Sequence, residues 1–328
     1  MGRCHGRRPA HRAAARLSEL LLVVARSVTV GGLLNLFVVY VVWSSTYLAI
    51  RIAVREDSGF PPFAMASLRV LVASAVLLGV AAAARTRLRL SKQELAVLAA
   101  SAVLLWVGGN GLVTWAEQRA HSGYAALLVG SMPIWIAVME AALDRKVPSP
   151  RLVAALLVGF TGLGLLTAPV LAAGVAAEDA AVLALLAAPI SWGIGSLLLK
   201  RRPLSVGTLA TAGYQNAFGG VALLVAALAT GEPIPNPTPE AWTAWAYLVV
   251  FGSILAFTAY VQVLRLLPMS VISTYAYVNP VGAVVLGRLV LNEPITPLTI
   301  AGAALVLLGV AGVFREQLRT PPPAVAAA

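Results

Sequence analysis

The feature of this sequence that most limits its fold is a series of ten long segments almost without charge. Each has at least about the 20 residues that a helix needs to cross roughly 30 Å of hydrocarbon. Only the second segment contains a charge, Arg69. We therefore expect an all-α integral membrane protein with ten transmembrane helices. The segments are 27–50, 58–84, 95–116, 120–139, 152–177, 180–199, 203–231, 241–264, 266–287 and 294–314.

Composition supports a membrane protein and argues against a nucleic-acid partner. Of the 328 residues, 59% are hydrophobic and 11% are charged, against about 25% charged in an ordinary soluble domain. The net charge of +11 could indicate nucleic-acid binding, but no basic patch is interleaved with aromatic residues. Cationic loops on the cytoplasmic side of a membrane explain the charge better. We expect a lipid bilayer and a small-molecule substrate as partners, and no nucleic acid.

Metal and thiol chemistry have few candidate residues here. Cys4 is the single cysteine, and His5, His11 and His121 all lie outside the interiors of the apolar segments. No phosphate-binding loop of the kind used by ATP-driven transporters is present. We therefore expect no metal site and no cofactor.

The distribution of cations predicts the orientation in the membrane. With the N-terminus in the cytoplasm, nineteen Lys and Arg residues fall on the inner side and three on the outer side. This asymmetry predicts cytoplasmic termini, with 1–26 as a basic tail and 316–328 as a C-terminal tail. Most acids, including Glu117, are assigned to outer loops. The protein is expected in the plasma (inner) membrane, and its Ala-, Arg- and Gly-rich composition indicates a bacterial source.

The two halves of the chain resemble each other at a shift of about 147 residues. Three pairs carry the repeat: Pro133 with Pro280, Pro150 with Pro297 and Gly162 with Gly309. Trp43 also matches Trp192 at a shift of 149. Because each half has five segments, an odd number, the halves must be inverted relative to each other. Two inverted five-helix repeats are typical of transporters that work by alternating access.

Three stretches resemble a known family. They are WSSTYLAIRIAV at Trp43–Val54, PPFAMASLRV at Pro61–Val70, and YVNPVGAVVLGRLVLNEPITPLTIAGAALVLLGVAGV at Tyr277–Val313. Together they resemble the EamA-type transporters of the drug/metabolite transporter superfamily, over about 29–315. The resemblance implies two EamA repeats, 27–170 and 178–315, cytoplasmic termini and export of small metabolites, often amino acids. The acid expected before the last helix of each repeat is Glu293 in the second, whereas Lys146 stands in the first.

Polar and aromatic residues share helical faces at spacings of three and four residues. Trp43 and Tyr47 do so in the first segment, and Tyr275 and Asn279 in the ninth. We predict that these faces line a central substrate cavity made by segments one, three, four, six, eight and nine. The alternative interpretation is contact between helices or an interfacial aromatic belt. The candidate substrate-binding residues are Trp43, Tyr47, Asn110, Trp192, Tyr275 and Asn279.

Two prolines and one arginine are further candidates. Pro133 and Pro280 each remove a backbone donor inside an apolar segment, which predicts a kinked pair at the repeat interface with a gating role. An ordinary helix kink is the alternative. A buried Arg69 costs roughly 2.5–3.5 kcal/mol on insertion scales, so it must face a partner or water. It could contact an anion in the pathway, or bond to carbonyl groups in a structural role.

Intramembrane charge also bears on energy coupling. Glu140 and Arg288 lie at nearly matched places of the two halves, where they could pair or extend toward the interface. The interiors of the segments contain no Asp or His, and Glu140 is the only carboxylate near a segment interior. We therefore expect transport down the substrate gradient, without obligatory proton coupling.

The leading functional prediction is a secondary transporter that exports an amino acid, an amine or a drug-like solute. The alternative is a membrane-embedded enzyme acting on a lipid or prenyl substrate. Such an enzyme would need paired aspartates, a Ser–His pair or a zinc-binding HExxH motif, and none is present. We therefore expect no enzymatic activity.

Overall fold

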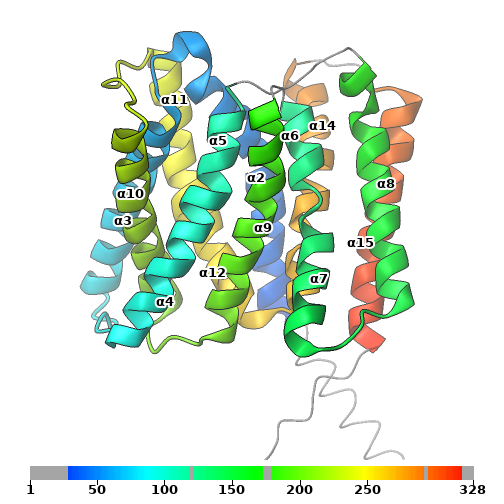
Figure 1. Ribbon diagram of the computed structural model, residues 1–328, viewed down its shortest axis with the longest axis horizontal. Helices are drawn as coiled ribbons and strands as arrows, with labels where there is room; N and C mark the ends of the chain where they lie inside the picture. The colour runs from blue at the N-terminus through cyan, green and yellow to red at the C-terminus, as the bar shows by residue number, and fades with distance from the viewer. Residues whose placement is uncertain (1–28, 119–121, 173–178, 292–294, 320–328) are drawn as a thin grey trace, which may run out of the picture.

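A computed structural model describes residues 29–118, 122–172, 179–291 and 295–319. These residues form helices and connecting turns, and ten of the helical spans are long and apolar enough to cross a membrane. The spans run side by side as a single bundle (Figure 1). The predicted fold class, an all-α membrane protein with ten spans in two inverted repeats, is thereby confirmed. The tail 1–26 lies outside the described residues.

Five spans come from each half of the chain. The first half consists of α2 (Val30–Val54), η1 (Glu56–Ser58), α3 (Pro62–Ala83), α4 (Lys92–Ala102), η2 (Val103–Gly111), α5 (Leu112–Ala116), α6 (Ser122–Val129), α7 (Met132–Asp144) and α8 (Pro150–Ala172). The second half consists of α9 (Asp179–Arg201), α10 (Thr208–Ala229), α11 (Pro239–Tyr247), η3 (Leu248–Ala256), α12 (Phe257–Leu266), α13 (Met269–Ile272), α14 (Tyr275–Leu291) and α15 (Pro297–Arg319).

Local sequence explains where several spans begin. Ser91 and Glu94 form a capping box at the start of α4, each side chain accepting from the other's backbone N–H, which satisfies donors that a helix start leaves unpaired. Pro62 and Pro239 occupy the first turns of α3 and α11, where the missing N–H of proline costs nothing.

The two halves pack in an inverted, interlocked manner. Helix α2, the first span of its half, packs against η3, α11, α12 and α14 of the second half. Helix α9, the first span of the second half, packs against η2, α4, α5, α6 and α7 of the first half. Each leading span therefore contacts the third and fourth spans of the opposite half, as an inverted repeat requires.

Glycines bring α8 and α15 into close contact. A Cβ built on Gly162 would lie 2.5 Å from the backbone nitrogen of Val306, and one on Gly309 would lie 2.6 Å from the backbone of Gly159. Small residues allow helix backbones to approach in lipid, where packing rather than the hydrophobic effect holds helices together. The repeat-matched pair Gly162 and Gly309 is thus part of one interface between the fifth and tenth spans.

Helices α3 and α10 form a second cross-repeat pair, and carboxylates join the two halves near both of its ends. At one end, the Glu232 carboxylate accepts from the backbone N–H groups of Phe63 and Ala64 at the start of α3, at 2.9 and 2.8 Å. At the other end, Glu94 Oε1 in the first turn of α4 accepts from the backbone N–H of Ser205, in the loop before α10, at 2.6 Å. We call these two contacts the carboxylate clamps. Each joins a loop or helix start of one half to the other half.

The third and eighth spans each contain a π-helical stretch at matched positions. The stretches η2 and η3 are nine residues long, and they start at Val103 and Leu248, 145 residues apart. π-helices are usually limited to single turns and often occur at functional sites. Their occurrence at equivalent places indicates that a widened helix is a shared feature of both repeats.

The fourth and ninth spans are interrupted. The fourth breaks between α6 and α7, and Pro133 stands in the first turn of α7, where proline is well tolerated. The prediction that Pro133 lies inside a continuous helix is therefore wrong. Pro280 does lie inside a helix, α14, whose start follows the short helix α13. The matched prolines thus occupy different local structures.

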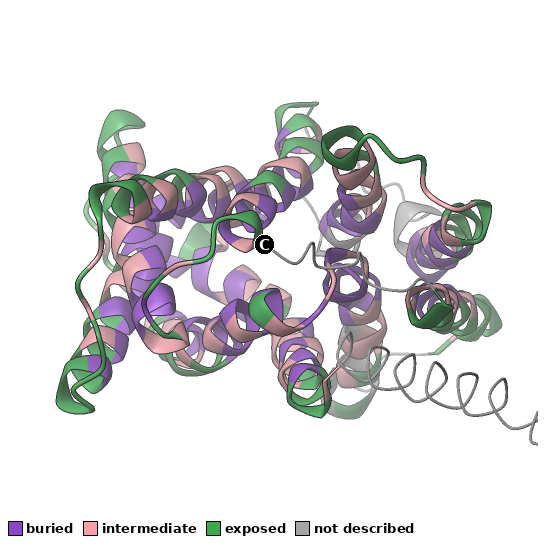
Figure 2. Ribbon diagram, turned by 90° about the horizontal axis from the view of Figure 1, so that it is seen from below, coloured by how far each residue is buried: buried purple, intermediate pink, exposed green. Residues whose placement is uncertain are grey.

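Burial is arranged as expected for a protein surrounded by lipid. Seen along the bundle, buried residues face the interior and exposed residues lie on the periphery (Figure 2). The exposed periphery includes large apolar side chains such as Phe37, Leu228 and Leu308. A soluble protein rarely exposes so much contiguous apolar surface.

Candidate functional site

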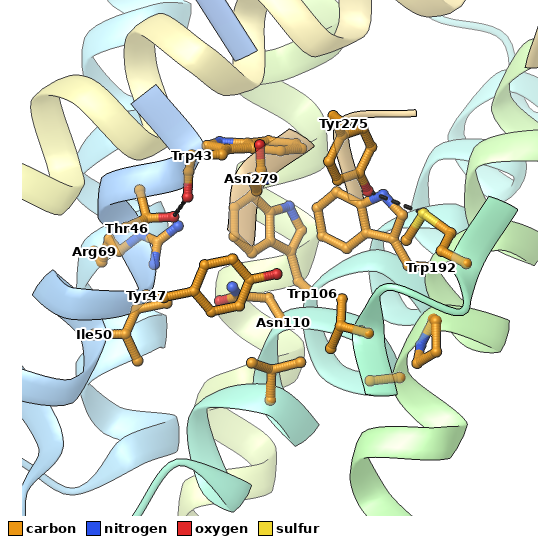
Figure 3. A pocket seen from close by; sticks show the side chains of 16 residues that line it. Trp43, Thr46, Tyr47, Ile50, Arg69, Trp106, Asn110, Trp192, Tyr275 and Asn279 are labelled. Atoms are coloured by element: carbon orange, nitrogen blue, oxygen red, sulfur yellow. Dashed lines mark hydrogen bonds between the residues drawn. The ribbon is translucent and has the colours of Figure 1, made fainter. Parts of the chain in front are cut away.

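A narrow cavity of about 80 Å³ lies at the centre of the bundle (Figure 3). Spans from both halves enclose it, because α2 and α9 each pack against the opposite half and both contribute lining residues. The lining side chains are mainly aromatic or uncharged polar, with a single charged group, Arg69. The lining residues are Trp43, Thr46, Tyr47, Ile50, Arg69, Trp106, Gly109, Asn110, Val113, Val129, Met132, Ala188, Pro189, Trp192, Tyr275 and Asn279.

All six residues predicted to bind substrate meet at this cavity, although they come from four different spans. They are Trp43, Tyr47, Asn110, Trp192, Tyr275 and Asn279. The set of lining spans differs in one respect from the prediction. The second span lines the cavity through Arg69, whereas none of the cavity-lining residues comes from the eighth span, which was expected to contribute. The eighth span instead contacts Arg69 through Ser253, whose hydroxyl accepts a hydrogen bond from the Arg69 side chain.

Three aromatic rings of the cavity wall form a cluster with Tyr260, which does not itself line the cavity. The ring centroid of Trp43 lies 5.0 Å from that of Tyr275, 5.1 Å from that of Tyr260 and 5.6 Å from that of Trp192. The Trp192 indole N–H donates to the Tyr260 hydroxyl at 2.9 Å. Edge-to-face and tilted contacts of this kind stabilise aromatic clusters beyond simple burial. Tyr260 in α12 therefore supports the aromatic part of the wall without reaching the cavity.

Arg69 is the central electrostatic feature of the site. Its side chain is only 3% exposed, and its Nε donates to Ser253 Oγ on η3 at 2.7 Å. The guanidinium carbon lies 5.6 Å from the ring centroid of Trp106, close enough for a cation–π contact. Its Nη1 has no hydrogen-bond partner among the described residues, and no described carboxylate pairs with it. The positive charge therefore remains available to a molecule in the cavity.

Other cavity residues also leave buried polar atoms without partners. Among the described residues these atoms are Trp106 Nε1, Asn110 Oδ1 and Asn279 Oδ1. Buried polar atoms in native proteins nearly always have a hydrogen-bond partner, so a cluster of exceptions requires an explanation. Together with Arg69 Nη1, the cavity presents a cation, a neutral donor and two acceptors.

The other predicted residues, apart from Arg69, do not line the cavity. Pro133 and Pro280 are buried beside it in α7 and α14 but do not line it. Arg288 belongs to α14, and its side chain lies outside the described part of the structure. Glu140 lines a different hollow, the cleft described next.

A separate cleft of about 490 Å³ opens near the ends of α7, α9 and α12. Glu140 shares it with Lys200, Arg201 and Arg265. These cations already have partners within the protein. Lys200 Nζ donates to the carbonyl oxygens of Leu264 and Leu267 at 2.9 and 2.7 Å, and Arg201 pairs with Asp144 at 2.8 Å. Glu140 therefore shares this cleft with cations that bind protein groups, and the cleft offers less free positive charge than its composition suggests.

Trp106 also lines the cavity; it precedes Asn110 by four residues and shares its helical face, so the spacing that identified Asn110 indicates Trp106 as well. Pro189 and Met132 line the cavity and were not predicted. Pro189 lies inside α9, and a proline within an apolar segment was a usable signal. Met132 accepts from the Tyr275 hydroxyl through its sulfur at 3.2 Å, and no sequence pattern indicated that contact.

Ten spans in two inverted, interlocked halves around a central polar and aromatic cavity define a secondary-transporter architecture. Within that class, the chain belongs to the EamA-like transporter family, whose family profile matches residues 30–168 and 179–315.

Several curated relatives support this assignment. The chain is 34% identical to the uncharacterized inner membrane transporter YedA of Escherichia coli (strain K12), over 77% of this chain and 80% of YedA. It is 25% identical to the uncharacterized transporter YoaV of Bacillus subtilis (strain 168), over 85% of this chain and 94% of YoaV. The chain is therefore a multi-pass inner membrane protein. Family and relatives indicate a transporter rather than an enzyme.

Two further similarities are more distant. An S-adenosylmethionine/S-adenosylhomocysteine transporter of Chlamydia trachomatis is 25% identical, over 85% of this chain and 87% of its own length. A solved crystal structure superposes with a TM-score of 0.72 at 22% identity, covering 88% of this chain and 98% of the other. The second similarity supports the fold alone.

Proposed function

We propose that this transporter exports a small metabolite bearing a carboxylate, by alternating access of the central cavity to the two sides of the membrane. One observation carries the proposal: Arg69 is buried in the cavity with Nη1 unpartnered and no described carboxylate nearby. A buried cation is costly unless it is paired. A carboxylate on the solute supplies the missing partner through charge-assisted hydrogen bonds.

The rest of the cavity favours a solute that also carries an ammonium group. The side-chain oxygens of Asn110 and Asn279 can accept hydrogen bonds from it. The faces of Trp43, Trp192 and Tyr275 attract a cation through their π-systems. An α-amino acid group combines both charges at short separation. The solutes named for the Chlamydia trachomatis relative contain such a group, which supports the same class here.

The test uses purified protein and matched ligands. We would measure thermal shifts with a panel of α-amino acids, each accompanied by its methyl ester and its decarboxylated amine. We expect stabilisation by one or more acids and little by their esters or amines. Arg69→Gln should weaken binding on the order of tenfold to a hundredfold, because hydrogen bonds to charged groups contribute about 1.5–3 kcal/mol. Saturable counterflow of the stabilising acid in proteoliposomes would then establish transport.

Two results would contradict the proposal. Equal stabilisation by an acid and its ester would show that the carboxylate is not recognised. Unchanged binding in Arg69→Gln would show that another group recognises it. Lys92→Gln, a charge removal at the exposed start of α4, is the matched control and should bind like the unmodified protein.

A further inference from the structure

Glu117 is a carboxylate in an unexpected environment. The sequence placed it in an outer loop, but the structure buries it completely, with 0% of its surface exposed, directly after α5. Neither side-chain oxygen has a hydrogen-bond partner among the described residues. An ionised carboxylate in this condition would lose its hydration without compensation, at a cost of several kcal/mol. The buried arrangement therefore requires the neutral, protonated acid.

The position of Glu117 is between two hollows. Val113, one turn earlier on the same helix, lines the central cavity. Trp115 and Gln118, on either side of it in sequence, line a second cleft of about 470 Å³ at the end of the bundle where α2 finishes and α3 begins. We call this second hollow the outer cleft, because the positive-inside pattern assigns this end to the outside. Glu117 thus belongs to the barrier between the central cavity and the outer cleft.

The described groups that face Glu117 leave its carboxyl without a counter-ion. On α2, Arg51 and Tyr47 lie within electrostatic range, but Arg51 donates to the main-chain carbonyl of Glu117 rather than to its carboxylate. Arg69 on α3 donates to Ser253 and makes no hydrogen bond to Glu117. The described residues of α6 and α9 that pack here are apolar, including Ala125, Ala181 and Leu185. Arg119 and His121 lie outside the described residues, and Asp179 at the start of α9 is exposed.

We propose that Glu117 is a proton-binding site that controls the outer gate of the transporter. When the outer side closes, the carboxylate takes up one proton from the outer cleft and is buried as the neutral acid. When that side opens, water and Arg51 stabilise the carboxylate, and the proton returns to the solvent. This inference rests on the proposed alternating-access function, and it replaces the expectation of transport without proton coupling. Burial raises the pKa of Glu117 to about 8 although Arg51 lowers it, which agrees with this assignment.

The test needs no substrate, so its result is independent of which solute is carried. In a Cys4→Ser background, Val113→Cys places a thiol at the cavity wall beneath Glu117. Intact cells are treated with the membrane-impermeant cationic reagent MTSET at pH 6 and pH 9. Labelling is normalised to Thr230→Cys, at an exposed position on the outer side, which corrects for thiol ionisation. We expect severalfold more labelling of Val113→Cys at pH 9, because ionised Glu117 favours the open gate.

The variant Glu117→Gln tests whether Glu117 is the group that binds the proton. It retains the shape of the neutral acid and cannot ionise, so labelling should stay at the pH 6 level at both pH values. Glu56→Gln, the same change at an exposed position on the same side, should keep the full pH response. The proposal is overturned if Glu117→Gln shows the same rise as the parent, or if the parent shows none. Ile50→Cys, another cavity position, replaces Val113→Cys if that variant does not reach the membrane.

Discussion

At the scale of single residues, the described cations differ in how their charge is satisfied. Lys200 donates to carbonyl groups and Arg201 pairs with Asp144, so both contribute to structure at their end of the bundle. Arg69 has one side-chain partner and a free donor that faces the cavity. Lys200 and Arg201 therefore hold helices in place, whereas Arg69 keeps a donor that, in our proposal, binds the solute. Among the acids, Glu117 resembles Arg69 in this respect. Its carboxyl has no partner among the described residues, and in our proposal it exchanges a proton.

The pH dependence of stability provides a residue-scale prediction for Glu117. Its pKa is raised by burial to about 8, from an ordinary value of 4.5. The protonated acid therefore stabilises the fold fully below about pH 4.5, and this contribution is lost as the pH rises through about 8. We expect the melting temperature of the parent to fall relative to that of Glu117→Gln between pH 5 and pH 9. Thermal unfolding of both purified proteins across this range is the measurement, and parallel curves would contradict it.

Residue patterns predicted much of the cavity but not its electrostatics. Helical spacing of three and four residues identified Trp43, Tyr47, Tyr275 and Asn279, because faces that are polar within lipid must turn inward. The burial of Glu117 could not be predicted in this way. It lies one residue beyond the end of α5, and whether such a residue meets water depends on how α2 and α9 cover that helix end.

At the scale of elements, the spans were predictable and their irregularities were not. Charge-free length is sufficient to locate a transmembrane helix. The π-helices η2 and η3 make tertiary contacts, such as those of Trp106 with Phe257 and of Ser253 with Arg69, and no local sequence pattern indicated them. At the break before Pro133, Ser131 accepts from the Trp135 indole N–H at 3.2 Å, a contact that the sequence did not indicate either.

The glycine interface between α8 and α15 supports an element-scale prediction. Gly309→Ala places a methyl group against the backbone of Gly159, at 2.6 Å, so the two helices must separate. We expect a loss of stability of about 1–3 kcal/mol, as for overpacked cores. Gly164→Ala, on the same helix pair but with open space around the new methyl group, is the control. Thermal unfolding in detergent measures both variants, and equal stability of the two would show that the interface can adapt.

At the scale of the whole molecule, orientation is predicted by the cation asymmetry and can be tested directly. In a Cys4→Ser background, Thr86→Cys follows α3 and Thr230→Cys follows α10, and both positions are exposed at opposite ends of the bundle. An impermeant thiol reagent added to intact cells should label Thr230→Cys and leave Thr86→Cys unlabelled until the cells are permeabilised. The reverse pattern would show that the termini are extracellular.

The carboxylate clamps also determine which parts of the molecule are free to move. Glu232 joins the start of α3 to the loop after α10, and Glu94 joins the start of α4 to the loop before α10. The two halves therefore cannot separate here, at either face of the membrane, without breaking a charged contact. We therefore expect α3 and α10 to stay in place relative to each other during transport. On this view the displacement occurs in the interrupted fourth and ninth spans, and the breaks at α6–α7 and α13–α14 are the expected hinges, one for each half of the molecule.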